Sequence, residues 1–345
     1  MTQTQVVLRQ FGTEEGLEIV QSPLQSLKAG KIRVRVEASS LTRTDLTIRK
    51  GLYPLLKTPP PFVLGYDFVG TVEESAEYPM TVKPGDRVAG ICQIGGHSTH
   101  IDVAPDQLLK VHSDLPGSQI APLVLSGMTA YQLLKYCAKL KQGDLFLVHG
   151  GSGAVGNILL QLCSAFGIRT ISTASKKNLS FINELGAQAI AYDSPNYFEK
   201  LKSIAGAGLD AALDFSSQKS INTSFSLLKP KGKLILAGLL ATQKKMERKT
   251  GWNFLKFGFE FVGMMLKKAI WNRFSNKEVH FFGIVDSKRD FPKRYQQDFD
   301  ELLAMLSSGK LKIHENIYPL SEARKAHLDL AEGRIKGNAI LQMYP

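Results

Sequence analysis

The glycine-rich stretch at residues 151–156, GSGAVG, constrains the fold of this chain more than any other feature. An apolar run at residues 145–148 precedes it, and an amphipathic run at residues 155–166 follows it. A strand, a glycine turn and a helix in this order are typical of a dinucleotide site. The glycines let the backbone approach a pyrophosphate, and the start of the helix attracts its negative charge. The glycine pattern alone is weak, so the flanking runs support the prediction.

The residues after the second apolar run indicate which dinucleotide would bind. This run, at residues 169–173, ends about 20 residues after the glycine turn, where NAD-specific folds place an acidic residue for the ribose hydroxyls. The chain has Ser175, Lys176 and Lys177 there instead. A hydroxyl and two ammonium groups suit a 2′-phosphate, because they add hydrogen-bond donors and positive charge. The pattern therefore predicts NADPH over NADH; the alternative is that both lysines open a solvated helix.

Length and composition predict a two-domain globular protein. The chain has 345 residues, of which 43% are hydrophobic and 21% charged. Its cysteines, Cys92, Cys137 and Cys163, form no CxxC pair, so we expect neither disulfides nor a zinc knuckle but a reduced, cytoplasmic setting. We find no signal-peptide pattern and no apolar run long enough to span a bilayer. The net charge of +12 suits anionic partners without choosing among them.

The order of predicted elements separates two kinds of structure. Before the glycine turn, short strands with turn signals are expected at residues 31–41, 68–73 and 86–91. After it, strands alternate with helices, and strand candidates lie at residues 145–149, 168–173, 189–192, 210–215, 233–237 and 280–285. Six strands are what a dinucleotide-binding sheet of two mononucleotide halves requires. The C-terminal part, with helices at 295–306 and 321–332 and a strand at 339–342, is expected to return to the first domain.

Several motifs resemble the medium-chain dehydrogenase/reductase superfamily, within it the zinc-independent quinone oxidoreductase and enone-reductase branch. In chain order they are LTRTD at 41–45, RKGLYP at 49–54, LGYDFVG at 64–70, VKPGDRV at 82–88, SGMTAY at 126–131, the glycine turn and LGA at 185–187. The resemblance covers nearly the whole chain. It implies an α/β protein with a GroES-like β-rich barrel domain, residues 1–124 and 288–345. A Rossmann domain with a doubly wound parallel sheet would occupy residues 125–287.

The resemblance also implies an enzyme that works without a metal. Zinc-dependent relatives have a Cys at the position of Thr42 and a His at that of Tyr66, and neither Thr nor Tyr is a usual Zn²⁺ ligand. Their four-cysteine lobe is missing from this sequence as well. His97 and His100, three apart on an expected strand, would point to opposite faces, so we expect no chelate there. Hydrogen-bond donors would then polarise the substrate oxygen.

The catalytic donors implied by the resemblance are Tyr53, Thr42 and Tyr66. Tyr53 matches a tyrosine that some enoyl-thioester reductases use as proton donor or carbonyl anchor; alternatively, it packs under Pro54. Tyr66 occupies the position of a metal ligand, so we expect its hydroxyl to face the substrate, with a packed ring as the alternative. Thr42 stands where the branch often has the Asn of an Asn-Pro pair, and its hydroxyl can still donate a hydrogen bond.

The resemblance further assigns contacts to the cofactor. Thr129 matches a residue that touches the nicotinamide or caps a helix at 130–136, and Tyr192 matches a tyrosine near the 2′-phosphate or is a strand-end aromatic. Gly238 and Gly283 would bring backbone close to the cofactor or form simple turns. The predicted cofactor-binding residues are Thr129, Gly151, Ser152, Gly153, Ala154, Val155, Gly156, Ser175, Lys176, Lys177, Tyr192, Ala237, Gly238, Phe282, Gly283, Ile284 and Asn338.

A basic and aromatic segment at residues 244–273 stands apart from these motifs. It holds eight Lys or Arg and two Glu, and the spacing of Leu255, Phe259, Val262 and Leu266 fits one face of a helix. We expect an insertion that roofs an apolar substrate cleft or forms a dimer contact. The alternative is a basic amphipathic helix that makes a peripheral contact with an anionic bilayer.

Together these observations predict an NADPH-dependent, zinc-independent oxidoreductase that reduces quinones or α,β-unsaturated carbonyls by hydride transfer. We expect a cytoplasmic homodimer in which the sixth strands pair across a two-fold axis, as in relatives. One alternative is an enzyme like the zinc-dependent alcohol dehydrogenases, which the missing ligands disfavour. Another is a cofactor-stabilised membrane-surface or RNA-binding protein with little turnover, although no specific nucleic acid is expected.

Overall fold

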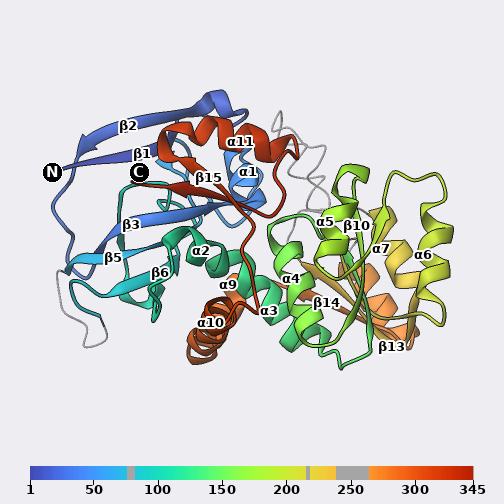
Figure 1. The fold of residues 1–345 in the computed structure, drawn as a ribbon. Coiled ribbons are helices and arrows are strands. Elements are labelled where there is room, and N and C mark those ends of the chain that lie inside the picture. The colour runs from blue at the N-terminus through green and yellow to red at the C-terminus, as the bar shows by residue number, and fades with distance from the viewer. Residues whose placement is uncertain (76–81, 215–217, 238–262, 264, 345) are drawn as a thin grey trace. The chain divides into compact units, whose positions relative to one another are not determined.

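The computed structural model describes residues 1–75, 82–214, 218–237, 263 and 265–344. The chain divides into two compact units (Figure 1). The β-rich unit comprises Met1–Met128 and Phe291–Pro345, and the α/β unit comprises Thr129–Asp290. Within the described residues, no helix combines the length and apolar character needed to cross a membrane.

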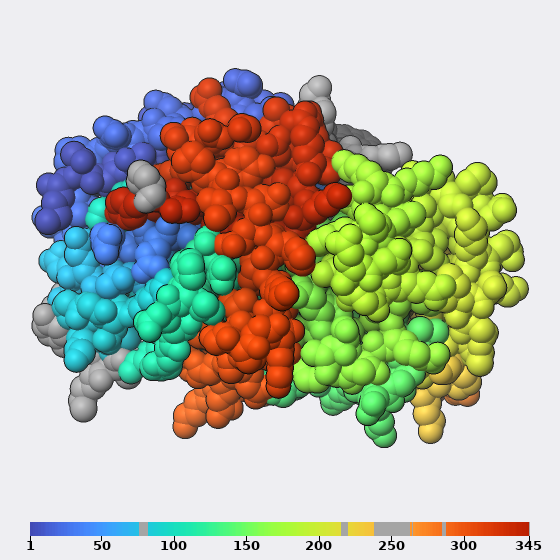
Figure 2. Space-filling view, viewed as in Figure 1, coloured from blue at the N-terminus to red at the C-terminus, as the bar shows by residue number. Residues whose placement is uncertain are grey.

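The β-rich unit contains a seven-stranded sheet, antiparallel except for the pair β15–β16. Its strands in spatial order are β15 (Glu315–Pro319), β16 (Asn338–Gln342), β3 (Ile32–Leu41), β5 (Asp67–Ser75), β6 (Arg87–Ile91) and β8 (Leu108–Lys110), with β7 (His100–Val103) also paired to β3. Side chains alternate along β3, where Val34 and Val36 are buried and Arg35 is exposed. Figure 2 shows the C-terminal residues in red lying beside the N-terminal residues in blue, as the pairing of β16 with β3 requires.

A smaller antiparallel sheet and several helices complete this unit. The sheet has the order β2 (Leu17–Pro23), β1 (Thr2–Leu8) and β4 (Phe62–Val63). The helices are α1 (Arg43–Arg49), α2 (Gly117–Pro122), α10 (Pro292–Ser307) and α11 (Ala323–Ala331), with shorter turns η1 (Glu14–Gly16), η2 (Pro105–Gln107), η3 (Leu123–Gly127) and η7 (Leu320–Glu322). From α2 the chain stays helical through η3, α3 (Met128–Gln132) and η4 (Leu133–Ala138), and both η3 and η4 are π-helical.

The α/β unit is built on one six-stranded sheet in which every pair is parallel. Its spatial order is β11 (Gln188–Ala191), β10 (Arg169–Ala174), β9 (Leu145–His149), β12 (Leu209–Asp214), β13 (Leu228–Ala237) and β14 (Glu278–Phe282). This is the doubly wound order, with the switch point between β9 and β12. Phe146, Leu147 and Val148 are fully buried, as expected of a central parallel strand. The predicted six-stranded sheet is confirmed.

The helices of this unit are α4 (Ala154–Ala165), α5 (Leu179–Glu184), α6 (Tyr197–Ala205), α7 (Gln218–Ser226) and α9 (Ile284–Asp290), with a short turn η5 (Lys176–Asn178). Their apolar faces bury a core that includes Leu147, Ile171, Leu201 and Leu234. One predicted boundary is wrong. The sixth strand was expected at 280–285, but β14 ends at Phe282, and Ile284 already belongs to α9. Among the described residues, pairing with β13 ends at Ala237↔Phe282.

Candidate functional site

The glycine turn joins β9 to α4 through a loop that has no room for side chains at two positions. A Cβ at Gly151 would overlap Ser172 Oγ on β10, and a Cβ at Gly156 would overlap the carbonyl oxygen of Gly150. Gly150 itself has φ of +76°. The 12-residue helix α4 starts directly after the loop and has no acidic residue in its first turn. Such a helix start, with backbone exposed by glycines, fits a pyrophosphate.

A second corner of the site lies at the ends of the next two strands. Ser175 is the N-cap of η5, directly after β10, and the side chains of Lys176 and Lys177 are exposed. Tyr192 follows β11, is 59% exposed and donates its backbone N–H to the carbonyl of Ala174. The structure therefore brings these four predicted residues to one edge of the sheet. Because they offer donors and positive charge there, they fit a 2′-phosphate.

Asn178 links this corner to the glycine turn, and sequence reasoning missed it. Its Nδ2 donates to Ser152 Oγ over 3.0 Å, and the side chain is only 6% exposed. Ser152 Oγ thus accepts a hydrogen bond and keeps its own proton for another acceptor. Gly150 also donates its N–H to the carbonyl of Thr173, so backbone and side-chain bonds together hold the two loops side by side.

A buried histidine under the glycine turn was also missed. His149 ends β9, and its Nδ1 lies 3.0 Å from Thr173 Oγ1 while its Nε2 lies 2.9 Å from Ser224 Oγ. Ser224 in turn donates to Asp214 at the end of β12. Burial lowers the pKa of His149, opposed by the charge of Asp214. The neutral imidazole therefore ties three strand ends together. The sequence did carry a signal for this network, because His149 and Asp214 are polar residues that each end a parallel strand.

In the β-rich unit, Tyr53 and Tyr66 form a pair. Their hydroxyl oxygens lie 2.6 Å apart, and their rings meet edge to face with centroids 5.7 Å apart. Tyr66 is 2% exposed, and burial, with Tyr53 second, raises its pKa above the ordinary value. Tyr66 therefore stays protonated in neutral solution. One hydroxyl donates to the other, and either can be the donor.

Thr42 has a different environment from the two tyrosines. It is the N-cap of α1, and both its N–H and its hydroxyl donate to Asp45 Oδ2 over 2.8 Å. Its Oγ1 accepts from the N–H of Thr44. Asp45 is fully buried, and burial raises the pKa of its carboxyl, opposed by His97 and by the bonds from Thr42. The hydroxyl proton of Thr42 is thus engaged within the protein, and a direct role in catalysis stays a prediction.

The positions of the zinc ligands in relatives do not form a zinc site here. The Thr42 hydroxyl bonds to Asp45 and the Tyr66 hydroxyl to Tyr53, so this donor set does not fit Zn²⁺. The described residues contain no cluster of three or more His, Cys, Asp or Glu side chains suited to a metal. The expected common strand of His97 and His100 is wrong. His97 instead lies in a bend before β7 and is fully buried, with its Nε2 3.2 Å from the carbonyl oxygen of Ser40.

The remaining predicted residues lie at element ends or inside a helix. Ala237 ends β13, Phe282 ends β14 before Gly283, and Ile284 starts α9, whereas Gly238 lies outside the described residues. Asn338 starts β16 and is buried. The alternative that Thr129 caps a helix is wrong, because Thr129 lies within α3 in a helical stretch that begins at α2. Of the basic segment, residues 244–262 and 264 lie outside the described residues.

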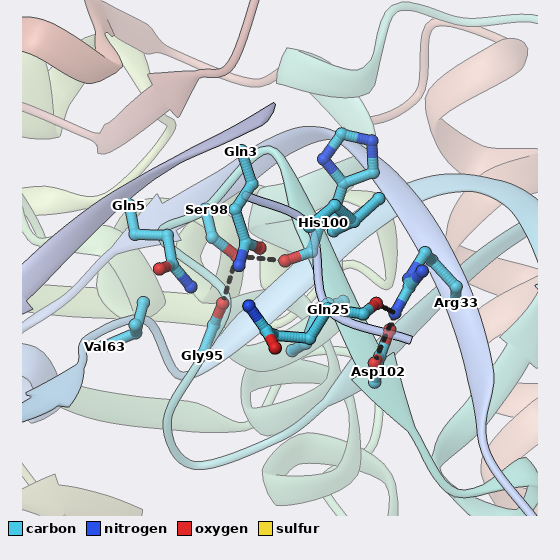
Figure 3. Close-up of a pocket in the computed structure, with 11 residues that line it drawn as sticks. Gln3, Gln5, Gln25, Arg33, Val63, Gly95, Ser98, His100 and Asp102 are labelled. Atoms are coloured by element: carbon cyan, nitrogen blue, oxygen red, sulfur yellow. Dashed lines mark hydrogen bonds and ion pairs between the residues drawn. The ribbon is translucent and has the colours of Figure 1, made fainter. Parts of the chain in front are cut away.

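Figure 3 shows a different pocket, of about 220 Å³, in the β-rich unit. None of the predicted site residues lines it; the labelled lining residues are Gln3, Gln5, Gln25, Arg33, Val63, Gly95, Ser98, His100 and Asp102. The Arg33 guanidinium is neutralised by both carboxylate oxygens of Asp102, at 2.8 Å each, and by Glu74. Because the buried Arg33 is already paired with carboxylates, this pocket does not provide an anion site.

Comparison with known proteins identifies the family. Residues 28–145 match the alcohol dehydrogenase GroES-like domain, and residues 185–341 match the family described as zinc-binding dehydrogenase. The predicted GroES-like domain is thereby confirmed. The synaptic vesicle membrane protein VAT-1 homolog of Danio rerio is 31% identical over 246 residues, which are 70% of this chain but only 51% of that protein.

Two quinone oxidoreductases match over nearly the whole chain. That of Pseudomonas aeruginosa is 27% identical over 340 residues, 96% of this chain and 98% of that protein. The crystal structure of Escherichia coli quinone oxidoreductase complexed with NADPH superposes with a TM-score of 0.83 at 23% identity, covering 99% of this chain and 100% of that one. The chain therefore belongs to the medium-chain dehydrogenase/reductase superfamily, in its quinone oxidoreductase branch.

Proposed function

We propose that this chain is an NADPH-dependent oxidoreductase that reduces quinones or α,β-unsaturated carbonyls without a metal. The observation that carries the proposal is the hydroxyl pair of Tyr53 and Tyr66, 2.6 Å apart, at the positions that the superfamily's motifs assign to the substrate. The related quinone oxidoreductases and the NADPH complex of the E. coli enzyme support the reaction class and the cofactor.

The residues of the α/β unit fit the proposed cofactor. The narrow loop at Gly151 and Gly156 and the start of α4 would hold the pyrophosphate. Ser175, Lys176, Lys177 and Tyr192 would hold the 2′-phosphate. Bound NADPH supplies a hydride from nicotinamide C4.

The tyrosine pair supplies the proton and the hydrogen bond that the substrate requires. A conjugated carbonyl that accepts a hydride develops negative charge on its oxygen, and a positioned donor stabilises that charge. In the arrangement that we propose, Tyr66, the more buried partner, donates to Tyr53. Tyr53 can then direct its own O–H to the substrate oxygen. The hydrogen bond from Tyr66 stabilises negative charge on the Tyr53 oxygen and so makes Tyr53 a stronger donor.

Thr42 contributes to this arrangement indirectly, by fixing the start of a helix. Its hydroxyl and N–H bind Asp45 and fix the start of α1, the helix that precedes Tyr53. A zinc ion has no place in the proposal, because the hydroxyls of Thr42 and Tyr66 are engaged with Asp45 and Tyr53. The polarisation of the substrate therefore comes from hydrogen bonds alone.

The test measures NADPH oxidation with a panel of quinones, enals and enones for three purified variants. Tyr53→Phe removes the outer donor, and we expect kcat/KM to fall roughly a hundredfold. Tyr66→Phe keeps that donor but removes its support, so a smaller fall of roughly tenfold is expected. The control is Tyr344→Phe, whose hydroxyl contacts the carbonyl of Thr99 and not the pair. Wild-type turnover by Tyr53→Phe, or no turnover of any panel member by the wild type, would reject the proposal.

A further inference from the structure

We propose that the outer face of the helix at residues 265–274 is a docking surface for an anionic lipid bilayer. This helix belongs to the α/β unit and precedes β14. It forms the described end of the basic and aromatic segment of the sequence. The surface uses none of the residues assigned to the proposed reaction.

The outer face carries a stripe of large apolar side chains. Leu266, Ile270 and Phe274 follow one another at four-residue spacing, which places them on one face of a helix. They are 61%, 56% and 82% exposed, and the neighbouring Met265 is 41% exposed. Other exposed large apolar side chains of the described residues are spread over both units. A contiguous exposed stripe of this kind marks an interaction site, whereas isolated exposed apolar residues are ordinary.

Other side chains of the same helix anchor it to the unit. Trp271 stacks on Phe225 of α7, with ring centroids 3.8 Å apart and planes 8° apart. The ammonium group of Lys267 lies 4.6 Å above the Trp271 ring and bonds to Asn222. Lys268 lies over the ring of Phe281. Because these contacts fix the helix to the α/β unit, the apolar stripe has a defined position on the surface of that unit.

Charge favours an anionic bilayer over a second copy of the chain. Residues 265–277 contain Lys267, Lys268, Arg273 and Lys277 and no acidic residue. Arg273 is exposed and, two helical turns after Leu266, lies on the same side of the helix as Leu266. In a two-fold dimer through this face, the Arg273 side chains of the two copies would bring like charges together. An anionic lipid surface instead attracts them while its acyl boundary accepts the apolar side chains.

The experiment measures co-sedimentation of the full-length chain with two kinds of vesicle. One is phosphatidylcholine alone, and the other contains roughly 30 mol% phosphatidylserine. The test variant is the triple substitution Leu266→Ser, Ile270→Ser and Phe274→Ser. Its matched control replaces two exposed aromatics elsewhere in the same unit, Phe166→Ser and Phe198→Ser. A third variant, Arg273→Glu, reverses one charge on the outer face. Circular dichroism melts check that every variant folds.

We expect the wild type to bind the phosphatidylserine vesicles, to bind phosphatidylcholine alone far more weakly and to detach as salt increases. The triple variant should bind at least about tenfold more weakly, Arg273→Glu should lose part of the affinity, and the control should bind as the wild type. Light scattering measures the mass of each variant in solution. Failure of the wild type to bind, or equal binding by the triple variant, overturns the proposal. So does a triple variant that only splits a dimer, since the face then belongs to a second copy.

Discussion

Two exposed lysines after β10 determine the cofactor preference in the proposed function. Lys176 and Lys177 follow the N-cap Ser175 at the edge of the sheet. The double variant Lys176→Glu, Lys177→Glu replaces two attractive charges by two repulsive ones. We expect the Kd for NADPH to rise at least tenfold, because hydrogen bonds to charged groups contribute about 1.5–3 kcal/mol each. The Kd for NADH, which lacks the 2′-phosphate, should change little. Isothermal calorimetry measures both.

The control for this prediction is Lys202→Glu, an exposed lysine on α6 that is not among the predicted cofactor residues. It changes the net charge in the same direction and should leave both dissociation constants unchanged. If the double variant binds NADPH as tightly as the wild type, the two lysines only open a solvated turn, which is the alternative given by the sequence.

Residues on loops after strands could be predicted from the sequence, whereas their buried partners could not. The glycines and the lysines could be recognised because each group directly follows an apolar run in the sequence, so no long-range contact is needed to identify it. Asn178 and His149 act through Ser152, Thr173 and Ser224, and the last of these is far away in the sequence. Only the fold brings such pairs together. The same reason explains why the expected strand position of His97 was wrong.

At the scale of elements, the glycine turn makes different demands at its second and third glycines. A Cβ at Gly156 would overlap the carbonyl oxygen of Gly150, whereas a Cβ at Gly153 has only that same oxygen as a neighbour, at 3.4 Å. We therefore expect Gly156→Ala to lower the free energy of unfolding by about 1–3 kcal/mol without any ligand. Gly153→Ala should leave it within about 1 kcal/mol.

The affinity for NADPH should distinguish the Gly153→Ala and Gly156→Ala variants in a different way from their stability. The second glycine of this motif is where the backbone approaches the pyrophosphate, so Gly153→Ala should weaken NADPH binding although the protein is stable. Urea unfolding measures the first quantity and calorimetry the second. A Gly153→Ala protein with unchanged NADPH affinity would contradict the proposed position of the pyrophosphate.

Long periodic elements were predictable, and their ends were less so. The six parallel strands follow from apolar runs bounded by turn residues, because a sheet covered on both faces needs continuous apolar strands. The end of β14 was misplaced because Ile284 and Val285 continue the apolar pattern, although pairing with β13 stops at Phe282. The helical position of Thr129 was missed for a related reason. The π-helical turns on either side of α3 shift the usual periodicity, which obscures one continuous helical stretch.

At the scale of the whole molecule, buried histidines make stability depend on pH. Burial lowers the pKa of His97, of His149 and, most strongly, of His327 below the ordinary value of 6.5. A group with a lowered pKa in the folded state takes up its proton on unfolding, so its contribution to stability is complete above pH 6.5 and falls as the pH decreases. Burial raises the pKa of Asp45 and of Asp67, and these carboxyls act in the opposite sense. A variant at one histidine separates the two effects.

His327 is the most informative position for that variant. It is fully buried on α11, neither ring nitrogen has a hydrogen-bond partner among the described residues, and its ring lies 6.1 Å from that of His97. His327→Leu removes the proton uptake at similar side-chain volume. The stability of the variant relative to the wild type should therefore rise as the pH decreases from about 8 to about 5.5. Urea unfolding at each pH measures it, with the exposed His112→Leu as control. A stability difference that does not change with pH would show that His327 is not held neutral by burial.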